Sequence, residues 1–118
     1  MVRKIDNLTN DAKFLLSSMY KIYVERRKNG ELKRNATNFI SVENIHETIM
    51  PEWHEEDVKS TCFELKKHGL ISGTNAGNSI AFIDLTTEAI AIMENQFKDK
   101  IDTVLDYANK IKGAIPFI

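Results

Sequence analysis

The chain of 118 residues has little of what marks secreted or membrane proteins: it has one cysteine, two prolines, five glycines and no long apolar run. A single cysteine excludes an intrachain disulfide, so we expect a reducing cytoplasm as its compartment. The longest apolar run, residues 89–93, is far shorter than the roughly 18–20 residues that a membrane span needs. The charged first residues have no apolar stretch behind them, so no secretory signal is expected.

Soft metal ligands are equally scarce. Cys62 and the three histidines, His46, His54 and His68, are the only candidates, and no pair has the spacing of a zinc motif. Cys62 falls on the predicted inward face of a helix, where a free cysteine acts as a small hydrophobe and lacks an activating base. Paired carboxylates, a catalytic triad and a nucleotide-binding loop are also missing, so we expect no enzyme, metal or cofactor.

The net charge of −1 argues against strong nucleic-acid binding, but the charges are unevenly placed. Residues 1–34 carry nine Lys or Arg and four Asp or Glu, whereas the rest of the chain is acidic. This basic cluster could clamp phosphates, or it could be a solvated helix end where positive charge suits the helix dipole. Its members are Arg26, Arg27, Lys28, Lys33 and Arg34.

Apolar residues spaced by three and four predict helices, and turn residues between two strand-like runs predict a hairpin. Glycine or proline stands where most of the predicted helices end. Residues 70–72 and 79–85 are the strand-like runs, and they flank a turn cluster at 73–78. The chain, 1–118, is expected to be one domain, with helices over about 10–29, 42–50, 54–68 and 86–112 and a short strand at 38–40.

The order helix, strand, helix, helix, hairpin, helix is that of a winged helix. Residues 58–71 (VKSTCFELKKHGLI) resemble the recognition helix and first wing strand of bacterial winged-helix regulators, where an apolar pair follows the glycine. Residues 84–89 (DLTTEA) resemble the junction that follows the wing, with Ala89 replacing the usual glycine. Among small families the chain looks most like the YjcQ-like winged-helix proteins of Gram-positive bacteria and their phages. The resemblance implies an α+β, mainly α fold with its winged-helix core over 10–85.

The resemblance also implies that the third helix enters a DNA major groove while the wing touches a phosphate or the minor groove. Lys59 and Ser60 would approach base edges, and Lys67 and the basic cluster would hold phosphates. Phe63 could meet a thymine methyl group or a partner protein, although we favour its burial by the C-terminal helix. The residues expected to contact DNA, besides the basic cluster, are Lys59, Ser60, Phe63, Lys67 and the wing-tip residues Asn75 and Asn78.

Two features of the same region disfavour DNA. Asp57 and Glu64 would repel phosphate, and the wing at 73–78 contains no Lys or Arg. The alternative is a winged-helix module that binds protein through its acidic third helix, Phe63 and the apolar tail over 113–118.

The predicted last helix is long for such a small domain. Over residues 87–112 it would measure about 39 Å. Its apolar residues follow a nearly heptad spacing, and its second half would overhang the core and expose them. We therefore predict a homodimer through Phe97, Ile101, Val104, Ala108 and Ile111. The alternative is that the helix bends back over the first helix and completes the core.

Taken together, these patterns predict a dimeric cytoplasmic protein of bacterial or phage origin. Its expected function is regulation of transcription by binding double-stranded DNA, and protein binding is the alternative.

Overall fold

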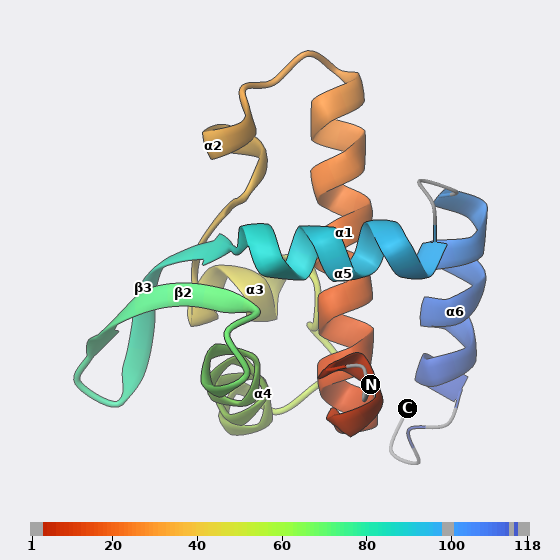
Figure 1. The fold of residues 1–118 in the computed structure, drawn as a ribbon. Helices are drawn as coiled ribbons and strands as arrows, with labels where there is room; N and C mark the ends of the chain where they lie inside the picture. The colour runs from red at the N-terminus through yellow and green to blue at the C-terminus, as the bar shows by residue number, and fades with distance from the viewer. Residues whose placement is uncertain (1–3, 98–100, 114, 116–118) are drawn as a thin grey trace.

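The computed structural model describes residues 4–97, 101–113 and 115, which form an α+β, mainly helical fold with one three-stranded antiparallel sheet (Figure 1). The expected α+β, mainly α class is therefore confirmed. A single 3₁₀ turn (Lys4–Asn7) is followed by α1 (Asn10–Lys28), α2 (Lys33–Ala36), β1 (Asn38–Ser41), α3 (Val42–Thr48), α4 (Glu55–Lys67), β2 (Ile71–Ala76), β3 (Ser79–Leu85), α5 (Thr87–Phe97) and α6 (Ile101–Gly113).

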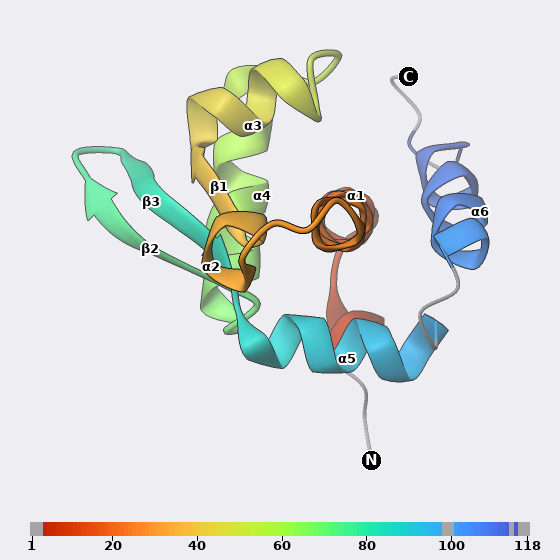
Figure 2. The same cartoon turned by 90° about the horizontal axis from the view of Figure 1, so that it is seen from above.

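Helix α1 is the centre of the molecule. Thr9 caps it, because its side-chain oxygen accepts a hydrogen bond from the backbone N–H of Ala12 at 3.3 Å. Leu15, Leu16 and Met19 are fully buried. The view along α1 shows α6 on one side, α3 and α4 on the other, and α5 crossing below (Figure 2). Helix α1 is thus buried on several sides, whereas an ordinary amphipathic helix is buried on one side only.

Helices α3 and α4 pack beside α1 and support the sheet. The Ser41 hydroxyl caps α3 by accepting from the backbone N–H of Asn44 at 3.2 Å. Val58, Cys62 and Leu65 form the buried stripe of α4. This buried stripe follows the three-and-four apolar spacing from which the helix over 54–68 was predicted.

The sheet has the strand order β1-β3-β2, and its hairpin contains a bulge. Phe82 adopts the left-handed region at φ 55° and forms an extra residue in β3. The extra residue lets Ile80, Ile83 and Leu85 all point into the core. Gly73 lies opposite, where an added Cβ would stand 2.5 Å from Ile80 Cγ2 and 3.1 Å from the Ala81 oxygen. The absence of a side chain at this position allows the hairpin to close over the bulge.

The expected single helix over 86–112 is wrong. The structure has α5 and α6 as separate helices, and α6 lies beside α1 rather than continuing away from the core (Figures 1 and 2). Burial of apolar surface against α1 favours this arrangement over an overhanging helix in water. A surface ion pair between Lys112 Nζ and Glu52 Oε1 at 3.0 Å adds a contact near the end of α6.

The residues expected at a dimer interface are consequently occupied within one chain. Phe97, Val104 and Ala108 are buried, and Ile111 is half-buried against the same core. The Ile101 side chain lies outside the described residues. Of the apolar tail over 113–118, only Gly113 and Ile115 are described, and Ile115 is buried. The homodimer stays a prediction. It was based on an exposed row of apolar side chains along the last helix, and the described residues do not form such a row.

Within the described ranges, no helix has both the length and the apolar character required to cross a membrane.

Candidate functional site

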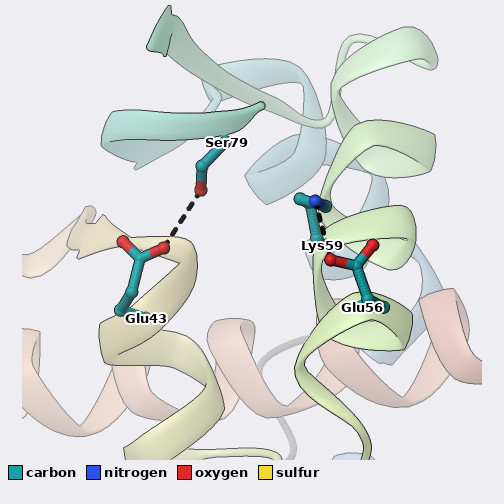
Figure 3. A network of polar contacts seen from close by, with 4 residues as sticks. All are labelled: Glu43, Glu56, Lys59 and Ser79. Carbon is teal, nitrogen blue, oxygen red and sulfur yellow. Dashed lines mark hydrogen bonds and ion pairs between the residues drawn. The ribbon is translucent and has the colours of Figure 1, made fainter. Parts of the chain in front are cut away.

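The first candidate is the α4 face, meaning the outward side chains of α4 together with the adjoining ends of α3 and the hairpin (Figure 3). Lys59 Nζ forms an ion pair with Glu56 Oε1 at 2.9 Å, and the Lys59 side chain is only 23% exposed. The Ser79 hydroxyl donates to Glu43 Oε2 at 3.1 Å and so connects the hairpin to α3. The cation that was expected to approach DNA bases is therefore already paired within its own helix.

Acidic groups crowd this side of α4. Glu64 accepts hydrogen bonds from the Thr9 backbone N–H at 2.8 Å and the Thr9 hydroxyl at 2.7 Å, so it fastens α4 to the start of α1. Burial raises the pKa of the neighbouring Asp11, the nearby Trp53 side chain lowers it, and the charges of Asp57 and Glu64 raise it further. A phosphate would meet a negative potential here.

The other residues expected to meet DNA on this face have different environments. Ser60, Lys67 and Asn78 are exposed, whereas Phe63 is half-buried against the core. Asn75 Oδ1 accepts from Lys66 Nζ at 2.6 Å, which connects the hairpin to α4. Ser60, Lys67 and Asn78 are thus the members of the expected set that remain open on this face.

The basic cluster separates into one structural arginine and several exposed cations. The Arg26 guanidinium donates to the backbone oxygens of Ala36 at 3.3 Å and Asn38 at 2.8 Å, and lies 4.9 Å from the centre of the Phe39 ring. Arg26 therefore holds α2 and β1 against α1 through its Nη1 atom. The exposed members of the cluster are Arg27, Lys28, Lys33 and Arg34.

These exposed cations and the α4 face do not lie together. Thr9, which hydrogen-bonds to Glu64 of α4, directly precedes α1, whereas Arg27 lies in the last turn of α1, about 27 Å farther along the helix axis. In Figure 1 the sheet lies between α2 and α4. The basic cluster therefore lies toward the opposite end of α1 from the contact between Thr9 and Glu64.

The second candidate is the sheet patch, which we define as Ile40 of β1 and Phe82 of β3. Their side chains are 56% and 76% exposed, and Leu32 before α2 is the other large hydrophobic with high exposure in the described chain. Ile40 pairs with Ile83, so it lies directly across from the Phe82 bulge. The sheet patch therefore consists of two exposed apolar side chains from neighbouring strands, at adjacent positions of the β1–β3 register.

The backbone at the sheet patch is strained. Ile40 has φ 71° and Phe82 has φ 55°, and these are the non-glycine residues with positive φ in the described chain. A β-branched or bulky residue rarely adopts this region. The Ile40 backbone N–H donates to Asn38 Oδ1 at 3.0 Å, which supports the unusual turn. Sequence reasoning missed both residues, although the adjacent apolar pair of Phe82 and Ile83 breaks strict alternation and is a possible signal of a bulge.

Chemistry at Cys62 is disfavoured by its surroundings. The side chain is buried, and burial raises the pKa of the thiol to about 12, with a smaller contribution from the charge of Glu43. The thiolate that a nucleophile or metal ligand needs is therefore disfavoured. No group of three or more potential metal-binding side chains occurs in the part of the chain that the structure describes.

Comparisons with family models, curated proteins and solved structures give no match for this chain. Its function is inferred below from its own surfaces.

Proposed function

We propose that the chain is a winged-helix domain that binds a partner protein through the sheet patch. The order of α1, β1, α3, α4 and the β2–β3 hairpin supports this fold, as does the sheet order β1-β3-β2. Gly69, at φ 75° and two residues after the end of α4, supports the resemblance of residues 58–71 to a recognition helix and its wing. A fold of this kind does not by itself determine which ligand is bound, so the proposed function rests on the exposed surfaces of the chain.

The observation that carries the proposal is a strained backbone that projects apolar side chains into solvent. Each L-residue in the left-handed region costs about 1–2 kcal/mol, and both members of the sheet patch adopt it. Strain of this kind clusters at functional sites. A phenyl ring that protrudes from a rigid sheet is also the type of side chain that anchors protein interfaces. Burial of Phe82 and Ile40 by a partner would recover the apolar contact that their exposure forgoes.

Nearby charges indicate the chemistry of the partner. Helix α2 carries the exposed cations Lys33 and Arg34 and leads directly to the sheet. The Leu85 backbone N–H donates to the Thr37 oxygen at 2.8 Å, and the Thr37 hydroxyl lies 3.4 Å from Asp84 Oδ1. The cations are thus attached to the same strands as the sheet patch. We infer that the partner presents an apolar segment flanked by Asp or Glu, because such a segment complements both features.

Selection from a displayed library of random peptides tests this function. Peptides that combine apolar residues with Asp or Glu should be enriched on the wild-type protein, and a synthetic copy should be titrated calorimetrically. Phe82→Ser should weaken its binding by at least tenfold, because removing a central aromatic anchor commonly costs about 2 kcal/mol or more. Ser60→Ala, an exposed change on the α4 face, is the matched control and should leave affinity unchanged. Equal binding by wild type and Phe82→Ser would refute the proposal.

A different observation supports duplex DNA binding as a second candidate. Lys33, Arg34 and their exposed neighbours in the basic cluster could neutralise phosphates, and Ser60 and Lys67 remain open on the α4 face. Retention of a random duplex pool across salt concentrations tests it. Paired reversal Lys33→Glu and Arg34→Glu should reduce the salt slope by about two if these residues contact phosphate, whereas Lys67→Glu tests the α4 face separately. Absence of retention at low salt would remove this candidate.

A further inference from the structure

A cavity of about 260 Å³ lies between α1 and α6 and is bordered by the end of α3. Phe14 and Val104 contribute apolar walls, and Ser17, Lys21 and Asn109 contribute polar groups. This cavity is separate from both the α4 face and the sheet patch. Its lining contains apolar and polar residues in equal number, so it can contact both an apolar body and a polar head group of a small molecule.

Ser17 is the most unusual group in this lining. Its side chain is fully buried, and its hydroxyl oxygen has no hydrogen-bond partner in the described part of the chain. A buried hydroxyl without a partner is unfavourable, because it has lost water and gained nothing in exchange. A ligand or a bound water that reached the base of the cavity would satisfy it.

Lys21 gives the cavity a positive charge. Lys21 is half-buried, one turn after Ser17 on α1, and forms no ion pair with any side chain in the described ranges. Lys112, by contrast, also lines the cavity but is paired with Glu52 at 3.0 Å. An anion that entered would therefore meet an ammonium group that has no ion-pair partner among the described side chains, beside a hydroxyl that has no hydrogen-bond partner there.

We propose that this cavity binds a small organic carboxylate with a compact apolar body. The carboxylate would accept hydrogen bonds from Lys21 Nζ and from the Ser17 hydroxyl, and the apolar body would pack between Phe14 and Val104. An engineered protein cavity of about 150 Å³ accommodates benzene, so this larger one suits an acid of about ten non-hydrogen atoms. The ligand would contact both α1 and α6, and its binding would stabilise the packing of α6 on α1.

Thermal unfolding and calorimetric titration with octanoate and cyclohexanecarboxylate test the proposal, with octanamide and cyclohexanecarboxamide as uncharged partners of the same shape. The acids should raise the Tm of the protein in a saturable manner, and the amides should raise it much less. Lys21→Met should weaken acid binding by about tenfold or more, because it removes a charge-assisted hydrogen bond while keeping the length of the side chain. Lys28→Met, an exposed change outside the cavity on the same helix, should bind as wild type does.

A second variant locates the site independently of charge. Ala108→Leu places extra carbon atoms in the cavity and should abolish binding of both acids, and circular dichroism establishes that the variant is folded. Backbone amide shifts on titration should concentrate on α1 and α6, which identifies the cavity even if Ala108→Leu does not fold. Equal effects of acid and amide, unaltered acid binding by Lys21→Met, or no saturable binding at millimolar acid would overturn the proposal. The last of these results would leave only water as the partner of Ser17.

Discussion

Replacing Phe82 by glycine should stabilise the folded chain relative to replacing it by alanine. Both substitutions remove the exposed ring, so they differ only in the presence of a Cβ atom at a position with φ 55°. At an ordinary strand position the order is reversed, because glycine loses more backbone entropy on folding. Thr74 of β2 is exposed, has no positive φ, and lies in the same hairpin, so it is the matched control position.

The size of the effect follows from two opposing contributions. Removing Cβ at Phe82 relieves the left-handed strain, which is about 1–2 kcal/mol. The greater flexibility of glycine in the unfolded chain opposes this by about 0.5–1 kcal/mol. Phe82→Gly should therefore be more stable than Phe82→Ala by about 0.5–1 kcal/mol, whereas Thr74→Gly should be less stable than Thr74→Ala by about the same amount.

Equilibrium unfolding in guanidinium chloride measures all four variants, with the free energy of unfolding extrapolated to water. The dependence on denaturant should be equal among them, because none of the changes alters the surface exposed on unfolding. If glycine is less stable than alanine at both positions by the same amount, the backbone at Phe82 is not strained. Backbone strain at Phe82 would then no longer support a binding role for this residue, independently of any binding result.

Three further predictions test the core, the bulge and the position of α6. Cys62 should resist thiol-reactive reagents at pH 8 in the folded chain and react fully in denaturant, because its thiol is buried and its pKa is raised to about 12. Gly73→Ala should lower the free energy of unfolding by about 1–3 kcal/mol through its contact with Ile80, whereas Gly113→Ala, which meets no atom within 4 Å, should not. Val104→Ala should lower the free energy of unfolding by about 2 kcal/mol, because Val104 is buried within one chain. For the same reason, the Tm of the wild type should not depend on protein concentration. A Tm that rises with protein concentration would instead support the dimer interface.

The helices of the core were predictable because local signals and the final packing agree. The apolar spacing predicted helices over about 10–29 and 42–50, and in the structure Thr9 and Ser41 cap α1 and α3 at these starts. The turn cluster at 73–78 also placed the hairpin. The β-bulge of this hairpin was not predicted. Because Phe82 and Ile83 are both apolar, strand alternation alone does not indicate which of them faces the core. The choice depends on Gly73 across the hairpin, where a side chain would collide.

The direction of α6 was beyond the sequence pattern for a related reason. Apolar spacing indicates which side of a helix is buried, but not what covers it. Val104 and Ala108 satisfy the spacing of a dimer seam and also that of a helix packed on α1. The same ambiguity affected the basic cluster. A count of charges could not reveal that the Arg26 guanidinium is bound by the backbone oxygens of Ala36 and Asn38.

The strain at the sheet patch connects the stability of the fold to its proposed function. If Phe82→Gly is more stable than the wild type while Phe82→Ser weakens partner binding by at least tenfold, then the wild-type residue is retained at a cost in folding free energy, as expected of a binding residue. A purely structural residue gives the opposite pairing, because substitution would destabilise the fold without a specific effect on binding. Ile40 provides an independent instance, since its backbone is also left-handed and its side chain also protrudes. Ile40→Gly should show the same combination of higher stability and weaker partner binding. If Ile40→Gly instead lowers the free energy of unfolding, only the Phe82 ring would remain as a candidate binding residue.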